Sequence, residues 1–320
     1  MKARILAVAI AIAAMAGLPT WAVLSHHAPA GRSSASAPAT GASVAPSSPG
    51  HVPARFAGVA VNDLDAFDHL CRCRPAIAVH YVNIGSTTSL INARIMILHG
   101  SMPLLELEPR GIPLAQIISG KEDQWLSRFA AGIRHLAVRV ILSFGPEANG
   151  HWYSWGYHHV APALFVSAWR HVVRVFRAAG ATNARWAWIM NQSYPHSEPV
   201  SLLWPGHRYV DLLGIDGYFK VPGATFSQVF APTIAEMRRL SHAPLLISET
   251  GASPSFGKLR AMHQIVAGVV RYGLAGFIWF DVAQHGSLNR QDWRLDTNHA
   301  ALAVFRKAAR ASSPEGSSRS

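Results

Sequence analysis

The chain has 320 residues, half of them hydrophobic, which is enough to bury the core of one large domain. Lysine and arginine total 29 against 17 aspartate and glutamate residues, a net charge of +12. No run of basic residues is longer than two, so the concentrated basic patch typical of nucleic-acid-binding proteins is absent and we expect no nucleic-acid partner.

The N-terminal residues are expected to lie outside the folded domain and to contribute nothing to it. Residues 1–24 begin with Lys2 and Arg4, continue as an apolar run and end near small residues, the three regions of a signal peptide. An uncleaved N-terminal anchor is the alternative, since a membrane span needs about 20 apolar residues. Residues 25–53 are rich in Ser, Ala and Pro, which predicts a flexible linker, and residues 312–320 predict a disordered tail. We therefore expect a secreted or extracytoplasmic protein, without membrane contact unless the anchor is retained.

Short apolar segments rich in β-branched and aromatic residues recur along the remaining chain. They lack strict alternation of polar and apolar side chains, as expected of parallel strands buried on both faces. The predicted strands are 55–61, 76–83, 102–109, 138–144, 184–191, 210–219, 244–250 and 276–281.

Helical patterns lie between these strands. Residues 161–180 have Pro162 in the first turn and Gly180 at the end, an asymmetry typical of helices. Residues 192–208 have the weakest helical pattern. Two further helices are indicated by apolar stripes, formed by Trp125, Phe129, Ile133 and Leu136 in one, and by Leu259, Met262, Val266 and Val269 before Gly273 in the other.

Eight strands alternating with helices over roughly 250 residues predict a (β/α)8 TIM barrel, a single domain spanning 54–311. An open doubly wound sheet is the alternative, but no G-x-G-x-x-G motif follows the first predicted strand. Catalytic groups of a barrel project from the carboxyl ends of its strands. Candidate functional residues are therefore sought at those ends.

Two glutamates lie at carboxyl ends of predicted strands. Glu147 follows the fourth strand in "SFGPEANGHWYSWG", and Glu249 ends the seventh in "ISETGAS". Glycosidic cleavage requires one carboxyl group to protonate the leaving oxygen and another to attack the anomeric carbon. A salt bridge or a helix cap is the structural alternative for either residue alone. Further acidic residues expected at the same rim are Glu106, Glu108, Asp216 and Asp281.

Aromatic side chains and one amide gather at the same predicted rim. Large aromatic residues expected on loops usually mark a ligand surface, and sugar rings have an apolar face that packs on flat aromatic rings. Each aromatic residue alone is more often part of the core, but their concentration indicates a polysaccharide-binding cleft. The candidate substrate-binding residues are Trp152, Trp155, Tyr218, Asn191 and Trp279, and Phe280 lies beside them in the sequence.

The segment 143–156 contains Glu147, an Asn-Gly pair, two Trp residues and a final Gly. Together with "ELEPRGIPLAQIISGKEDQWLSRFA", "WPGHRYVDLLGIDGYF", "LLISETGAS" and "DWRLD", it resembles glycoside hydrolase family 26 over about residues 55–305. Members of that family are retaining barrel enzymes, mostly β-mannanases with some mixed-linkage β-glucanases. The resemblance implies that Glu147 is the general acid/base and Glu249 the nucleophile. It also implies that Trp152 lines the cleft and that Tyr218 hydrogen-bonds the nucleophile.

Two positions depart from that family's pattern. Ser143 stands where the family has Arg, and Pro146 stands where it has His, immediately before the acid/base. The family's Arg and His orient or tune catalytic carboxylates and touch sugar. Their replacement predicts a changed substrate class or weaker hydrolysis.

The sequence thus predicts a monomeric, secreted, retaining endo-β-glycosidase that acts on a β-mannan or β-glucan class polysaccharide and needs no cofactor. The alternative is a catalytically weak glycan-binding or envelope protein on the same barrel, although retention of both acids favours the enzyme. A serine hydrolase is disfavoured because no G-x-S-x-G motif occurs, and a metallohydrolase because no H-E-x-x-H motif occurs. Cys71 and Cys73 predict two thiols or one bridge without a catalytic role.

Overall fold

The structure, a computed structural model, describes residues 56–86, 89–284 and 291–312. Eight parallel strands form a closed barrel in which each strand pairs with the next and β8 pairs with β1. Closure confirms the predicted TIM barrel and excludes an open sheet. The strands are β1 (Phe56–Ala60), β2 (Ile77–Asn83), β3 (Met102–Glu108), β4 (Val140–Phe144), β5 (Ala184–Asn191), β6 (Leu212–Phe219), β7 (Leu245–Ala252) and β8 (Gly276–Phe280).

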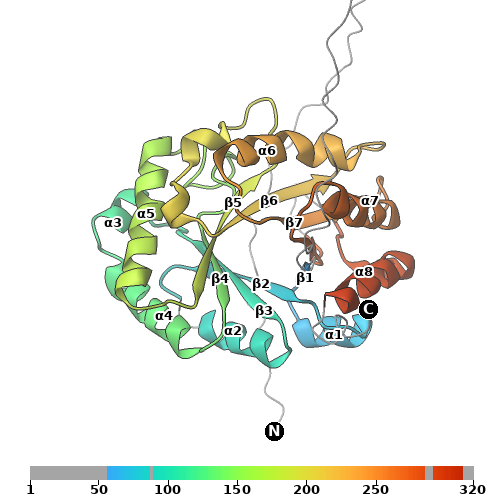
Figure 1. Ribbon diagram of the computed structural model, residues 1–320, viewed down its shortest axis with the longest axis horizontal. Helices are drawn as coiled ribbons and strands as arrows, with labels where there is room; N and C mark the ends of the chain where they lie inside the picture. Colours follow the sequence, from blue (N-terminus) through green and yellow to red (C-terminus); the bar gives the residue numbers. More distant parts are fainter. Residues whose placement is uncertain (1–55, 87–88, 285–290, 313–320) are drawn as a thin grey trace, which may run out of the picture.

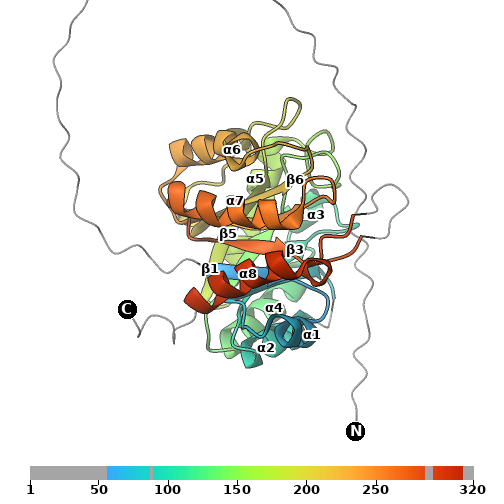
Figure 2. The same ribbon diagram turned by 90° about the vertical axis from the view of Figure 1, so that its right-hand side faces the viewer.

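Helices form a ring around the strands (Figure 1). Viewed from the side, α6, α7 and α8 lie next to one another along one wall of the barrel (Figure 2). The α-helices are α1 (Leu64–Cys71), α2 (Ser89–Leu98), α3 (Leu114–Ile118), α4 (Asp123–His135), α5 (Pro162–Ala178), α6 (Phe226–Leu240), α7 (Lys258–Arg271) and α8 (His299–Ala311). The short 3₁₀ helices are η1 (Val200–Leu203), η2 (His207–Tyr209) and η3 (Leu295–Thr297), and the first two confirm that residues 192–208 are the least helical connection.

Local sequence signals fix where several helices begin and end. Pro162 occupies the first turn of α5, and Gly180 follows that helix with a φ of +76°. Thr225 caps α6 through a reciprocal capping box with Gln228. Asn298 caps α8 by accepting a hydrogen bond from the backbone of Ala301.

The predicted apolar stripes match the core faces only in part. In α4, Phe129 and Ile133 are buried as expected. In α7 the buried face is centred on Ala261 and Ile265, so Met262 and Val269 belong to it, while Leu259 and Val266 lie at its partly buried edge. The buried face of α7 differs from the predicted stripe because it includes Ala261, a small residue that adds little to a hydrophobic pattern in the sequence.

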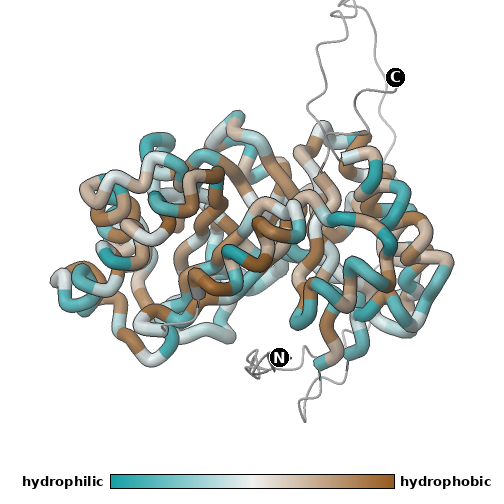
Figure 3. Tube along the Cα trace, turned by 90° about the horizontal axis from the view of Figure 1, so that it is seen from below, coloured by the Kyte–Doolittle hydropathy of each residue, from teal (hydrophilic) through white to brown (hydrophobic). Residues whose placement is uncertain are grey.

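The core has two layers separated by the strands. Side chains inside the barrel include Val79, Leu104, Ile141, Ile189 and Ile278. The outward faces of the same strands pack against the helices in a larger cluster. Hydrophobic segments accordingly run through the interior, and hydrophilic segments gather on outer turns (Figure 3). A filled interior leaves the strand ends as the place where a ligand can enter.

Cys71 and Cys73 form a disulfide bridge at the end of α1, which decides between the two alternatives left by the sequence. The expected signal segment 1–24 and linker 25–53 lie outside the described residues, as do residues 313–320 of the expected tail. Within the described ranges, no helix has the length and apolar character needed to cross a membrane.

Candidate active site

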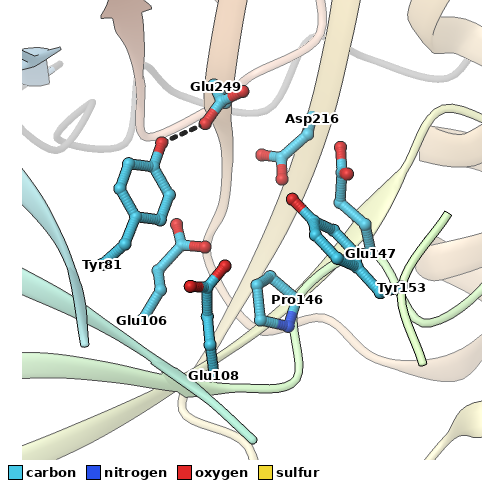
Figure 4. Close-up of a pocket in the computed structure, with 8 residues that line it drawn as sticks. All are labelled: Tyr81, Glu106, Glu108, Pro146, Glu147, Tyr153, Asp216 and Glu249. Atoms are coloured by element: carbon cyan, nitrogen blue, oxygen red, sulfur yellow. Dashed lines mark hydrogen bonds between the residues drawn. The ribbon is translucent and has the colours of Figure 1, made fainter. Parts of the chain in front are cut away.

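A pocket of about 300 Å³, including its open mouth, lies among the carboxyl ends of the strands. Five of its eight lining residues carry carboxyl groups, and these point toward one another from several strands (Figure 4). The lining residues are Tyr81, Glu106, Glu108, Pro146, Glu147, Tyr153, Asp216 and Glu249. The two predicted catalytic glutamates therefore lie in one pocket.

Glu147 lies in a tight turn directly after β4. Its φ of +55° is in the left-handed region, which is uncommon for a residue other than glycine and costs about 1–3 kcal/mol. The backbone N–H of Glu147 donates to the carbonyl of Ile189 on β5 at 3.1 Å, which holds the turn against the neighbouring strand. The strained backbone aims the carboxyl group into the pocket.

Two donors hold the Glu147 carboxyl group. Asn191 Nδ2 lies 2.5 Å from Oε1, and Trp152 Nε1 lies 2.7 Å from Oε2. The indole of Trp152 packs over Gly150, where a Cβ atom would come within 2.2 Å of the ring. Gly150 is therefore required for Trp152 to reach the carboxylate.

Asn149 fixes the position of Asn191. Its Nδ2 donates to the carbonyl of Asn191, and its Oδ1 accepts from the backbone N–H of Asn191, both at 2.8 Å. Asn149 is fully buried, so this pair of bonds joins the β4–α5 loop to the end of β5. The clamp places both the acid and its amide donor.

A β-bulge turns Glu249 into the barrel. Leu246 and Glu249 both face inward although they are three residues apart, which strict alternation forbids. Ile215 of β6 is paired with Ile247 of β7, but the next residue of β6, Asp216, is paired with Glu249. Ser248 is therefore the extra residue of β7. Bulges of this kind re-aim side chains beside active sites.

Two tyrosine hydroxyls donate to Glu249. Tyr81 from β2 reaches Oε2, and Tyr218 from β6 reaches Oε1. Burial is the main cause that raises the phenol pKa values of both tyrosines well above 10, so both retain their protons. The carboxyl group is thus held at both oxygens, by residues from two other strands.

Burial is also the main cause that raises the pKa of each of these two glutamates. For Glu249 the pKa rises to about 7, with the Glu147 charge as the next cause, while the two tyrosine donors lower it. For Glu147 burial outweighs the hydrogen bonds from Asn191 and Trp152. Since the Glu147 charge disfavours ionisation of Glu249, the two carboxyl groups do not ionise independently of each other.

The remaining carboxyl groups of the pocket have different surroundings. Glu108 receives two hydrogen bonds from Arg110, at 2.7 and 2.8 Å. Asp216 accepts from Ser248 Oγ at 2.6 Å. Among the described residues, no group of three or more His, Cys, Asp or Glu side chains is arranged to hold a metal ion. Asp281 instead has a structural role, since it accepts from the backbone N–H of Leu295 at 2.6 Å and anchors η3.

The predicted aromatic residues do not all reach the pocket. Trp152 is half-buried and stacks on Tyr194 with ring centroids 6.1 Å apart. Trp155 is buried and donates to the Pro146 carbonyl at 2.9 Å. Trp279 is buried on the helix side of β8 and donates to the carbonyl of Trp293 at 2.8 Å. Trp155 and Trp279 therefore present no ring face to a ligand, which corrects their expected place in a cleft.

Sequence reasoning missed Tyr81 and the clamp role of Asn149. Tyr81 is two residues beyond Val79, so the two side chains lie on the same inward face of β2. This spacing would have pointed to Tyr81 if the sequence had shown which face of β2 is turned inward. Phe280 faces the barrel interior and packs edge-on against Tyr218, with ring centroids 6.2 Å apart.

The family model described as Glycosyl hydrolase family 26 matches residues 121–306, more than half of the chain. The chain belongs to glycosyl hydrolase family 26. The match begins before α4, ends in α8 and includes both Glu147 and Glu249. The barrel described above is thus a family 26 barrel.

Individual relatives of this family 26 chain agree with the assignment. Endoglucanase H of Acetivibrio thermocellus is 27% identical over 230 residues, which cover 67% of this chain and 25% of that protein. The chain thus spans only about a quarter of the length of this curated relative. A family 26 β-mannanase of Bacteroides ovatus has a similar structure, with a TM-score of 0.62 and 16% identity, over 81% of this chain and 89% of the other. The structure of a Bacillus subtilis mannanase is similar with a TM-score of 0.60 and 16% identity, over 79% of this chain and 85% of the other. These structures share the fold.

Proposed function

We propose that this protein is a retaining endo-β-glycosidase that hydrolyses a β-mannan or β-glucan class polysaccharide. The observation that carries the proposal is the pair Glu147 and Glu249 in one pocket, each held by two side-chain donors. A carboxyl pair is what double displacement requires. The names of the relatives, an endoglucanase and β-mannanases, support the choice of substrate class.

In the first step, Glu147 gives its proton to the glycosidic oxygen while Glu249 attacks the anomeric carbon. The C–O bond to the leaving sugar breaks, and a covalent glycosyl ester forms on Glu249. In the second step, Glu147 takes a proton from water, and the water oxygen displaces Glu249 from the anomeric carbon. Both carboxyl groups return to their starting protonation states.

The hydrogen bonds at each glutamate suit these roles. Tyr81 and Tyr218 donate to Glu249 and stabilise its ionised form, which a nucleophile needs. Burial raises the pKa of Glu147, which favours the protonated form that a general acid needs. Trp152 and Asn191 fix the direction in which its proton is delivered.

The test is hydrolysis of mannan, glucomannan, mixed-linkage glucan and xylan by the parent and by E147Q and E249Q. We expect release of shorter chains from a mannan or a glucan, and a loss of about a thousandfold or more in kcat/KM in each variant. Proton NMR of the first product should show retention at the anomeric carbon. An inverted product would refute Glu249 as nucleophile. Binding without turnover would favour the alternative, a catalytically weak glycan-binding protein.

We also propose that the protein acts outside the cytoplasm as a monomer. The signal-like sequence of residues 1–24 supports export, although retention of this segment as an anchor is the alternative. The Cys71–Cys73 bridge agrees with an oxidising compartment. Cell fractionation and size-exclusion chromatography would test the location and the oligomeric state.

A further inference from the structure

Glu106 is a third inward-facing glutamate of the pocket. It lies on β3 two residues before Glu108, and its side chain lies between Tyr81 and Glu108 (Figure 4). Its exposed fraction is 1%. The double-displacement steps above use only Glu147 and Glu249, so they leave Glu106 without a role.

Each other carboxyl group of the pocket accepts at least one hydrogen bond from the protein. Arg110 donates to Glu108 and Ser248 donates to Asp216. The Oε1 atom of Glu106, in contrast, is buried and has no hydrogen-bond partner within the described part of the chain.

Ser143 adds a second unsatisfied atom next to Glu106. It is the register partner of Glu106 on β4 and is fully buried, and its Oγ has no hydrogen-bond partner among the described residues. A buried polar atom without a partner costs about 1–3 kcal/mol. Of these two atoms, the one on Glu106 belongs to a residue that lines the pocket, where a hydroxyl-bearing ligand could supply the missing partner.

The charges around Glu106 favour its neutral form. Burial raises its pKa well above 4.5, followed by the charges of Glu249, Glu108 and Glu147. Tyr81 faces it from β2 and keeps its own proton. A neutral carboxyl group donates one hydrogen bond and accepts others, which matches a sugar hydroxyl.

We propose that Glu106 determines substrate specificity by binding a hydroxyl group of the sugar ring seated between Glu147 and Glu249. This inference rests on the proposed function, because it places a sugar in this pocket. Epimeric sugars orient their hydroxyl groups differently. A site with a buried group that must be hydrogen-bonded discriminates strongly against a sugar whose hydroxyl cannot reach it.

The test compares E106L and E106Q in the E147Q background, where cleavage is prevented. Leu removes the unsatisfied carboxyl group and should preserve or raise the melting temperature. Gln keeps one donor and one acceptor and should preserve binding. Affinities for cellotetraose and mannotetraose are measured by calorimetry. We expect the affinity of E106L for the preferred oligosaccharide to fall tenfold or more, and the ratio of its affinities for the two oligosaccharides to come closer to one. The affinities of E106Q should stay within about threefold of those of its parent.

The matched control is D68N, which removes a partly buried carboxyl group remote from the pocket, paired with His99 at 2.7 Å. It should leave both affinities unchanged. Equal affinities of E106L and its parent would overturn the inference. A loss of affinity in E106Q as large as that in E106L would also overturn it. If E106L does not fold, E106Q alone decides: retained affinity and preference support the inference, and a tenfold loss overturns it.

Hydrolysis by the protein with Glu147 intact separates this inference from the proposed function. Binding without turnover would refute the glycosidase mechanism and leave the role of Glu106 to be judged on affinity. If the E147Q parent binds neither oligosaccharide, both proposals fail.

Discussion

At the scale of single residues, the hydrogen bonds to Glu249 should set the acidic limb of the pH profile. Tyr218→Phe removes one donor to the charged carboxylate, so the pKa of Glu249 should rise further above about 7. Because the nucleophile must be ionised, the acidic limb of kcat/KM should move to higher pH by roughly 1–2 units. Tyr272→Phe, which loses a hydroxyl bonded to Ser227 Oγ at 2.9 Å on the outer helices, is the control. Identical profiles for both variants would contradict this assignment.

Pro146 should set the basic limb through Glu147. Proline has neither a side-chain donor nor a backbone N–H, and it lines the pocket beside the acid. Pro146→His introduces a donor that favours ionised Glu147, so its pKa should fall and the basic limb should move to lower pH. The comparison is made on mannan and on glucan, with Pro146→Ala as the control. If the parent already prefers mannan, and the substitution changes neither this preference nor the basic limb, the account of position 146 is wrong.

At the scale of elements, Asn149 joins the β4–α5 loop to the end of β5. Asn149→Ala leaves the buried N–H and C=O groups of Asn191 without partners, which should cost about 2–4 kcal/mol and lower the melting temperature by roughly 5–10 °C. It should also lower kcat, because Asn191 then no longer holds Glu147. Asn183→Ala is matched, since Asn183 donates to Ile133 and Val138 carbonyls at the other end of β5.

Both variants should be destabilised, but the Asn183 variant should keep its kcat/KM when it is assayed well below its melting temperature. Equal losses of activity per folded molecule would show that the clamp has no specific effect on the site.

The elements of this barrel could be predicted from the sequence, but the facing of their side chains could not. Strands buried on both faces show where they begin and end without showing which side points inward. Trp279 and Phe280 are adjacent in β8, yet the first packs against helices and the second lies inside the barrel. Tyr81, which lines the pocket, was hidden for the same reason. Glu249 was found at the strand end, whereas the bulge that turns it inward carries no recognisable sequence signal.

At the scale of the whole molecule, the buried acids should make stability fall as the pH rises. Burial raises the pKa values of Glu106, Glu108, Glu147, Asp216, Glu249 and Asp281, the last two to about 7. The folded state then binds more protons than the unfolded state above about pH 4.5. The stabilisation from these extra protons is fully present below the unfolded pKa values and is lost as the pH rises through the raised pKa values, which for Glu249 and Asp281 lie at about 7. Burial lowers the pKa of His80 to about 4, so this one residue favours the folded state as the pH rises and opposes the effect of the six acids.

Melting temperatures recorded between pH 5 and pH 8 test this expectation. The protein should melt at a higher temperature at pH 5 than at pH 8, and Glu106→Gln should reduce the difference, since it removes one of these titrating groups. A melting temperature that rises steadily to pH 8 would contradict the charge states described for the pocket.

The central claim is that Glu249 forms a covalent bond to sugar while Glu147 handles the proton. Incubation with 2-deoxy-2-fluoro cellobiosyl and mannobiosyl fluorides, followed by peptide mass spectrometry, tests it most directly, because the fluorine slows breakdown of the ester. We predict one added glycosyl group, on the peptide containing Glu249, in the parent and none in Glu249→Gln. A label on Glu147, or no label on a protein that hydrolyses its polysaccharide with inversion, would contradict the claim.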